Sequence, residues 1–182
     1  MNQGLRRKDH IATEEKYTTL RELAYSATMD EFPDIQIQGI SFYDAVEADR
    51  WKTLPIDNAH RNTRSTWGWA EEYPFYQKRP NRFEITLRRG GVLCALSYGQ
   101  LSRKGSKLRL NLIESTPIRP TPLGMAALPV LSFAAAIFAD ITGAEELWVL
   151  DPDPGLESIY NNEGFGAREI YHGRRVGQRR IL

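Results

Sequence analysis

The sequence predicts an α/β fold of the α+β type, a mixed and mostly antiparallel sheet with flanking helices and a helical extension at the N-terminus. Three observations carry this prediction. The first part of the chain has helical periodicity, the middle holds three strand-like runs joined by short turns, and the last third alternates strands with helices. At 182 residues, the chain is expected to form a single domain over 1–182.

The first 77 residues are predicted to be mainly helical. A helix is expected over 12–29, with Thr13 and Glu15 in its first turn and Phe32-Pro33-Asp34 after its end. The run IQIQGISF then alternates apolar and polar residues, which is typical of a half-buried strand. The elements expected here are a strand over 35–42, a short helix over 43–54, a polar loop over 55–64 and an aromatic helix over 65–77.

Three runs in the middle of the chain predict an antiparallel meander. They are RFEITL (82–87), GVLCALSYGQL (91–101) and KLRLNLIE (107–114). The links RRG and SRKGS are short and rich in turn residues, as hairpin connections are.

The last third is predicted to contain a turn, a long apolar helix and a small closing sheet. The apolar run over 123–139 is shorter than the roughly 20 residues that cross a membrane, and Asp140 follows it, so we expect a buried core helix. Pro129 is expected to kink or restart that helix. The elements expected are a helix over 125–141, a strand over 146–150, a short helix over 156–161 and strands over 167–171 and 179–182.

Composition excludes several classes of function. Lys and Arg number 24 against 23 Asp and Glu, so the net charge of +1 gives no field that would attract nucleic acid or an anionic membrane. The one cysteine, Cys94, excludes an internal disulfide framework, and the N-terminus has no signal-peptide pattern, so a cytoplasmic protein is expected. The three histidines lie far apart in sequence, which predicts no metal site. The arginines near the C-terminus lack interleaved aromatic residues, so nucleic-acid binding is not expected.

The turn RPTPLG, Arg119 to Gly124, has a pattern that suits an anion. A turn from strand to helix aims backbone N–H groups and the positive end of the helix at a phosphate. Thr121 and Pro122 are expected to act as N-cap and first helical residue. A plain proline-rich loop before a core helix is the alternative interpretation.

The C-terminal half resembles the GNAT superfamily of N-acetyltransferases, in its stand-alone bacterial form. The segment SIYNNEGFG, over 158–166, is similar to the Leu-Tyr-x-x-x-Gly-Phe segment of that superfamily, with Ile159 in the Leu position. RPNRFEITLRRGGVLCALSYGQLS also resembles its bacterial members. The resemblance covers about 67–182, whereas residues 1–60 match nothing.

The resemblance implies a coenzyme A site at the turn. In the superfamily, this turn has the pattern Arg/Gln-x-x-Gly-x-Gly/Ala. Arg119 and Gly124 match this pattern here, but Pro122 replaces the first Gly. Proline has no N–H. The donors that remain for the pyrophosphate are Arg119, Thr121, Leu123, Gly124 and Met125.

It also implies two catalytic residues. Tyr160 would lie near the coenzyme sulfur and stabilise or protonate the departing thiolate, although the Asn usually found seven residues earlier is Asp153 here. Glu114, at the end of a strand, would take the proton of the amine, with Glu84 in reserve, and a backbone N–H around Ser115 would polarise the thioester carbonyl. The blander interpretations are a tyrosine that packs its ring under the sheet and a carboxylate that is solvated or paired with arginine.

The function that this resemblance implies is acetyl transfer from acetyl-CoA to an amine, by direct attack in a ternary complex and without a metal. The acceptor could be a small molecule or a protein, and the residues do not choose between them. The alternative is a GNAT-shaped acyl-CoA-binding or regulatory protein without efficient catalysis. Trp67 and Trp69 are expected to be core residues or a lid over the substrate cleft.

Overall fold

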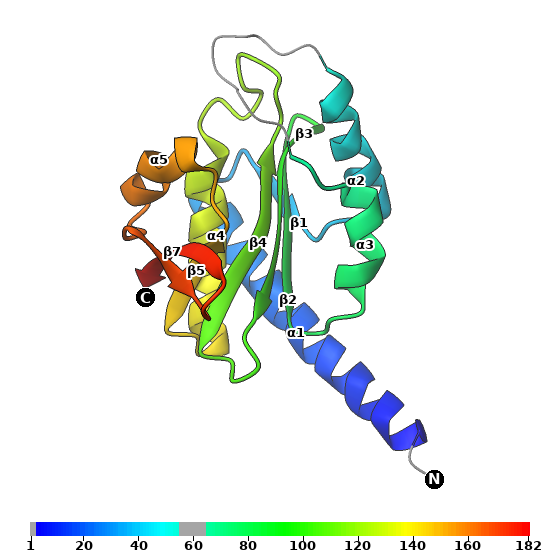
Figure 1. Cartoon of the computed structure of the whole chain (residues 1–182). Helices are drawn as coiled ribbons and strands as arrows, with labels where there is room; N and C mark the ends of the chain where they lie inside the picture. Colours follow the sequence, from blue (N-terminus) through cyan, green and yellow to red (C-terminus); the bar gives the residue numbers. More distant parts are fainter. Residues whose placement is uncertain (1–2, 55–64) are drawn as a thin grey trace.

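The chain is built around one seven-stranded mixed sheet, in the strand order β1-β2-β3-β4-β5-β7-β6 (Figure 1). The structure is a computed structural model that describes residues 3–54 and 65–182, with side chains from residue 9 onward. Only β4 and β5 pair in parallel; the other neighbours are antiparallel. This arrangement confirms the predicted fold class. The strands are β1 (Gln36–Gln38), β2 (Arg82–Arg89), β3 (Val92–Leu101), β4 (Lys107–Ser115), β5 (Glu146–Leu150), β6 (Arg168–Tyr171) and β7 (Arg175–Ile181).

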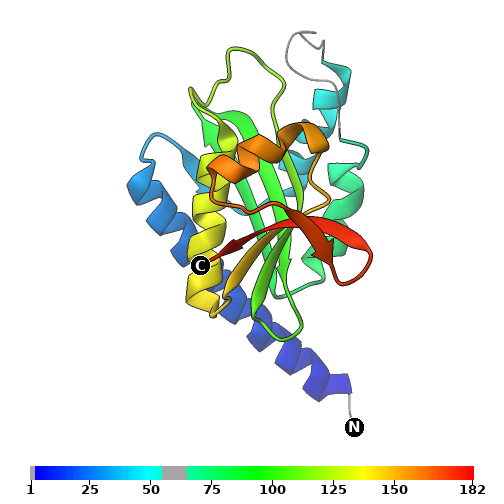
Figure 2. The same cartoon turned by 60° about the vertical axis from the view of Figure 1, so that its left-hand side comes forward.

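Helices cover both faces of the sheet. One face packs against α1 and α4, and the other packs against α2 and α3 (Figures 1 and 2). The N-terminal end of α1 projects beyond the sheet. The helices are α1 (Gln3–Glu31), α2 (Phe42–Asp49), α3 (Trp69–Gln77), α4 (Ala127–Thr142) and α5 (Glu157–Asn162), with 3-10 turns η1 (Arg50–Thr53) and η2 (Pro154–Leu156).

The long apolar helix α4 lies in the core, as predicted. It packs against the sheet and against α1, which lies beside it on the same face, and Val130, Leu131, Ala134, Ala135 and Phe138 are all buried. Among residues 3–54 and 65–182, no helix is long and apolar enough to cross a membrane.

The predicted start of α4 is wrong. Gly124 adopts a φ of 74°, in the left-handed region, and its N–H donates to the carbonyl of Thr121 at 2.9 Å, which closes a turn that a helix cannot continue through. The helix therefore begins at Ala127, with Ala126 as N-cap, so Thr121 and Pro122 are not its cap and first residue. Pro129 becomes the third helical residue, where the N–H that it lacks has no intrahelical partner in any case, and no kink is required.

Several other boundaries also differ from prediction. The strand expected over 35–42 is only three residues long, because Ser41 and Asp44 form a capping box that starts α2 at Phe42. The helix α1 is longer than 12–29, and β7 begins four residues earlier than expected. The helix expected over 65–77 begins at Trp69. The loop expected over 55–64 lies outside the described residues.

A network of buried charges ties α1 to β2. Glu14 accepts hydrogen bonds at 2.8 Å from both Arg21 and Arg82, and Arg21 also donates to the carbonyls of Pro80 and Arg82. Arg82 continues the network to Glu84, with 2.9 Å between Nε and Oε1. Two guanidinium groups and two carboxylates thus compensate one another in a site where an unpaired charge would be costly.

Arg82→Met should therefore destabilise the protein strongly. The substitution keeps much of the apolar volume but leaves Glu84 buried without its cation, and breaking such a pair typically costs about 3–5 kcal/mol. Urea unfolding measures the free energy. Arg175→Met is the matched control, because Arg175 pairs with Asp151 at 2.7 Å at the surface, where a pair contributes about 1 kcal/mol or less. Equal losses in the two variants would contradict a structural role for the buried network.

Candidate active site

The central feature of the sheet is an opening between β4 and β5. These parallel strands pair only from Lys107 to Leu110 of β4, whereas β4 continues to Ser115 beside β3. Asn111 has no partner in β3, since Tyr98 pairs with Leu112 and Gly99 with Leu110. This β-bulge redirects the strand at the position where pairing with β5 stops.

Backbone groups of β4 face the opening. The N–H of Thr116 donates to the carbonyl of Cys94 at 2.8 Å, so Thr116 points its backbone groups toward β3. Because these groups alternate in direction along an antiparallel strand, the N–H groups of Ile113 and Ser115 point the other way, into the gap. The backbone donor expected around Ser115 stays a prediction, with its N–H on the side of the gap by this alternation.

Glu114 lies on the α3 side of the sheet. Its side chain is buried, and its Oε2 accepts a hydrogen bond from the indole Nε1 of Trp69 at 2.6 Å. Trp69 is fully buried and packs against Tyr98, whose ring stacks on that of Tyr76. The Glu114 carboxylate therefore lies against a cluster of packed aromatic rings. Of the two predictions for Trp69, a core residue or a lid, the core position is the one observed.

Glu84, the reserve candidate for a base, is occupied by structural contacts. It pairs with Arg82 and accepts a hydrogen bond from Gln77 at 2.7 Å. Those contacts bind both oxygens within the network that holds α1, so Glu84 is poorly suited to exchange protons with a substrate.

Tyr160 lies on the other side of the opening, in α5. Its ring is buried in the core cluster that includes Val130 and Leu131 of α4, and Phe165 packs edge-on against it with ring centroids 6.1 Å apart. Both views place α5 beside the start of α4 (Figures 1 and 2). Burial raises the pKa of the Tyr160 hydroxyl to about 12, and the nearby charge of Asp153 adds to the rise. The hydroxyl therefore keeps its proton over the whole physiological range.

The segment after α5 explains why its sequence is distinctive. Gly164 adopts a φ of 83°, which ends the helix, and the next residue, Phe165, then turns inward and is buried. The N–H of Phe165 donates to the carbonyl of Tyr160 at 3.2 Å. The Gly-Phe pair thus fixes the end of the element that carries the tyrosine.

The turn between β4 and α4 is held by two arginines. Arg119 donates to the carbonyls of Thr116 and Ile118, at 2.8 and 2.9 Å, so its guanidinium folds back onto its own turn. Arg89, at the end of β2, donates to the carbonyl of Leu123 at 2.7 Å. Sequence reasoning missed Arg89 because it lies in the hairpin link RRG, and only the folded sheet brings it to the turn.

The residues predicted as donors in this turn differ in their contacts. The N–H of Gly124 donates to the carbonyl of Thr121 within the turn, whereas Met125 is exposed. Leu123 is buried and contributes its carbonyl to Arg89. The first N–H groups of α4, at Ala126, Ala127 and Leu128, have no intrahelical acceptor, and no side chain caps them. The start of α4 therefore adds free donors at the positive end of a helix, where an anion is favoured.

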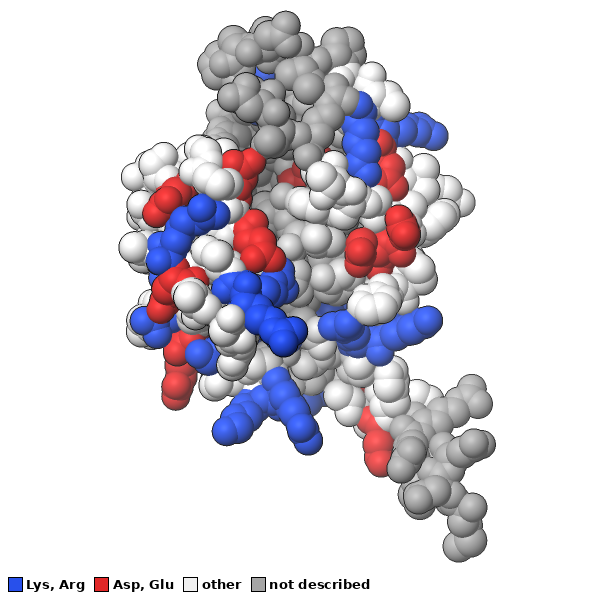
Figure 3. Space-filling view, in the orientation of Figure 1, with Lys and Arg blue, Asp and Glu red and all other residues white. Residues whose placement is uncertain are grey.

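These groups form an arrangement suited to an activated carbonyl. The opening offers backbone donors, with a carboxylate on the α3 side and a phenol and a helix start on the α4 side. The molecular surface is hollowed between the half that carries α5 and β7 and the half that carries α3, and acidic and basic side chains both lie around the hollow (Figure 3). No group of His, Cys, Asp and Glu in the described part of the chain could hold a metal ion.

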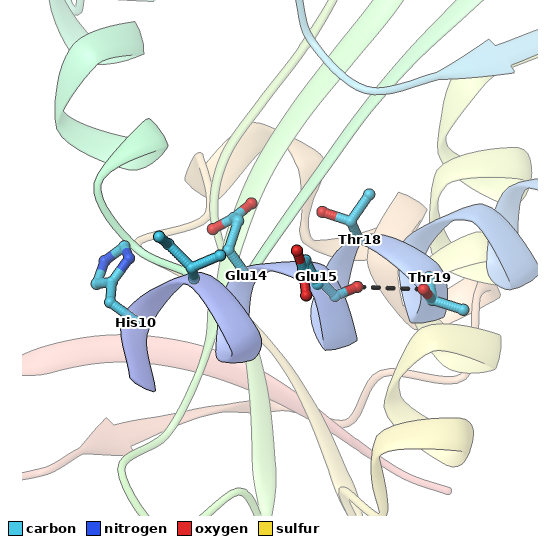
Figure 4. A pocket seen from close by; sticks show the side chains of 6 residues that line it. His10, Glu14, Glu15, Thr18 and Thr19 are labelled. Atoms are coloured by element: carbon cyan, nitrogen blue, oxygen red, sulfur yellow. Dashed lines mark hydrogen bonds between the residues drawn. The ribbon is translucent and has the colours of Figure 1, made fainter. Parts of the chain in front are cut away.

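A second hollow, of about 420 Å³, lies on α1, away from this opening (Figure 4). It is lined by one helix alone, and two of its side chains are engaged elsewhere: Glu14 pairs with Arg82, and Thr19 donates to the carbonyl of Glu15 at 3.1 Å. We assign no site to it. Its lining residues are His10, Ile11, Glu14, Glu15, Thr18 and Thr19.

Comparisons with known proteins find likeness in structure only. No protein-family model matches the sequence. A search of curated proteins by sequence also finds no match.

Solved structures resemble most of this chain in fold. An acetyltransferase from Thermus thermophilus has 15% sequence identity and a TM-score of 0.58, over 81% of this chain and 97% of that one. A chimera of the Vibrio cholerae spermidine N-acetyltransferase SpeG and hSSAT has 12% identity and a TM-score of 0.57, over 81% and 95%. The PaiA N-acetyltransferase from Thermoplasma acidophilum, in complex with coenzyme A, has 15% identity and a TM-score of 0.51, over 81% and 99%.

Proposed function

We propose that this chain, whose fold is that of the GNAT acetyltransferases, transfers an acetyl group from acetyl-CoA to an amine. The observation that carries the proposal is the opening between β4 and β5, which begins at the bulge of Asn111 and has backbone N–H groups along one edge. It joins the face that holds Glu114 to the side that holds Tyr160. A nucleophile and an activated carbonyl could meet there from opposite faces.

The residues present fit coenzyme A at the start of α4. The unpaired N–H groups of Ala126, Ala127 and Leu128, at the positive end of a 16-residue helix, would bind the pyrophosphate. Arg89 and Arg119 both donate hydrogen bonds to carbonyls of the turn that precedes α4. They would therefore hold the turn in shape, and not all of their N–H groups would be available to the phosphates. This arrangement meets the requirement for an anion site despite Pro120 and Pro122.

The thioester would supply a carbonyl activated for attack. The N–H groups of Ile113 and Ser115 would donate to its oxygen and stabilise the negative charge that develops there. Glu114 would accept a proton from the bound ammonium, directly or through water, and so free the nitrogen lone pair for attack, because a primary amine with a pKa near 10.4 is mostly protonated at neutral pH. The nitrogen–carbon bond forms, the carbon–sulfur bond breaks, and the sulfur leaves as a thiolate.

Tyr160 would stabilise that thiolate mainly by a hydrogen bond. A phenol with a pKa of about 12 is a weaker acid than a thiol with a pKa near 8.5, so full proton transfer is uphill by about 5 kcal/mol. A phenol that keeps its proton is still a good donor to sulfur. The raised pKa thus favours stabilisation over transfer.

The acceptor is proposed to be an amine that is cationic in solution. The spermidine N-acetyltransferase chimera, which shares the fold, supports this class of substrate. The competing candidate is an acyl-CoA-binding or regulatory protein, favoured by Pro122 and by Asp153, where the superfamily has Gly and Asn.

Coenzyme A should raise the melting temperature of the protein, and Gly124→Ala should reduce that rise by half or more. A Cβ at Gly124 would lie 2.5 Å from Nη1 of Arg89, which displaces the arginine from the turn. Thermal unfolding with and without coenzyme A measures the effect. Gly143→Ala is the control, because Gly143 has almost the same φ, 77°, but open space around it. If the two variants keep equal ligand-induced shifts, the coenzyme site lies elsewhere.

Tyr160→Phe should lower acetyl transfer by roughly 10²-fold without loss of acetyl-CoA binding, because it removes one hydroxyl and little volume. The defect should be constant between about pH 6 and 9, since the hydroxyl does not titrate below about pH 11. Steady-state kinetics with a responsive amine measures both effects. Tyr171→Phe, another buried tyrosine but in a separate cluster, should keep full activity. Full activity in Tyr160→Phe would exclude the residue from the mechanism.

Glu114→Gln should give a defect that depends on pH. Without a base, the rate follows the fraction of amine that is already neutral, so the loss should shrink as pH rises toward about 10. A pH series of kcat/KM for the acceptor tests this expectation. A defect that stays flat across the series would remove Glu114 from the role of base. If acetyl-CoA binds but neither Glu114 nor Tyr160 affects any transfer, the regulatory interpretation is the better one.

A further inference from the structure

We propose that Trp69 is a positioning residue for Glu114, and that Asp49 in turn holds Trp69 in place. This inference rests on the proposed function, since it assigns the contacts that keep the proposed base oriented. Neither Trp69 nor Asp49 touches the backbone donors of the opening. Their effect on catalysis would pass through the Glu114 carboxylate.

The contact between Trp69 and Glu114 is short and enclosed. Nε1 of the indole lies 2.6 Å from Oε2, and both side chains are almost fully buried. An N–H donated to a carboxylate is a charge-assisted hydrogen bond, which is stronger than a neutral one. The indole therefore fixes the direction of one carboxylate oxygen, as a base requires.

The position of Trp69 is set by α2 rather than by its own helix. The residue before it, Gly68, is the N-cap of α3 and has no side chain to cap the helix. Asp49, at the end of α2, supplies the missing cap: Oδ1 accepts from the N–H of Trp69 at 2.8 Å and Oδ2 from that of Ala70 at 3.0 Å. Lys52 donates to Oδ1 of Asp49 at 3.3 Å and to the carbonyl of Trp67. The backbone at the start of α3 is thus held by hydrogen bonds before Trp69, at Trp67, and after it, at Ala70.

Packing restricts the indole further. The rings of Trp69 and Tyr98 lie 5.5 Å apart, and Trp67 packs edge-on against Trp69 at 6.3 Å. A planar group enclosed by rings on two sides can rotate little. Its N–H direction is therefore defined before any substrate arrives, which is the condition for preorganised catalysis.

The test replaces the indole N–H and leaves the ring. Incorporation of 3-benzothienylalanine at position 69 puts sulfur in place of the nitrogen with almost no change of shape, and Trp69→Phe is a second variant made by ordinary mutagenesis. The chain contains a matched control: Nε1 of Trp148 donates to Oε2 of Glu146, also at 2.6 Å, on β5. The same analogue at position 148 removes an equivalent bond from a different carboxylate.

Two readouts are needed. The first is kcat and KM at pH 7, measured with acetyl-CoA and a responsive amine. The analogue at position 69 should lower kcat about 10-fold and leave KM for acetyl-CoA unchanged, because the base loses its orientation while the coenzyme site is intact. The analogue at position 148 should leave both constants as they are. Asp49→Asn should lower kcat as well, because it weakens the cap that holds Trp69.

The second readout does not require turnover. Thermal unfolding with and without coenzyme A should give the same ligand-induced rise in melting temperature for the wild-type protein and for the analogue at position 69, because the bond lies outside the coenzyme site. An unchanged kcat in the analogue at position 69, or an equal loss of kcat with the analogue at position 148, overturns the inference even if acetyl transfer is found. If the wild-type protein binds coenzyme A but acetylates no amine, the proposed function fails, and this inference fails with it.

Discussion

The parallel pairing of β4 and β5 breaks off after four residues, and most of the molecule is arranged around that break. A strand in the middle of a sheet normally satisfies its backbone groups on both sides, so an unpaired edge inside the sheet is costly unless something else binds it. Here the bulge at Asn111 ends the pairing, while β3 continues to hold β4 up to Ser115. The sheet therefore stays continuous through β3, and one stretch of β4 has no paired strand on the β5 side.

Polar contacts between distant segments fix the helices on either side of this opening. On one face, Asp49 binds the start of α3; on the other, the buried pairs of Glu14 and Arg82 bind α1, which in turn covers α4. Gln77, at the end of α3, belongs to the same network through Glu84. The two helical layers are thus connected by hydrogen bonds around the sheet as well as by apolar packing through it. Geometry at the opening depends on both.

The sequence predicted the elements better than the contacts. The three central strands and the core helix follow from the spacing of apolar residues and from the turn residues between the runs. Tyr160 and the Gly-Phe pair were singled out through a local motif. The start of α4 was predicted wrongly because Thr121-Pro122 is a good local start signal, whereas the left-handed turn at Gly124 prevails over it. Asp49, Arg89 and Trp69 could not be assigned their contacts, since each partner lies 20 or more residues away and only the register of the sheet and the packing of α2 on α3 bring them together.

Under the proposed function, the alanine at the N-cap of α4 is a compromise between helix stability and ligand binding. Serine at Ala126 would supply an oxygen for the free N–H groups and stabilise an ordinary helix by about 1 kcal/mol. That oxygen would also accept hydrogen bonds from the N–H groups that would otherwise bind a phosphate. A more stable helix would therefore bind the phosphate more weakly. An uncapped helix of this kind is less stable than a capped one. Selection for a more heat-resistant chain would therefore be expected to act at other positions first.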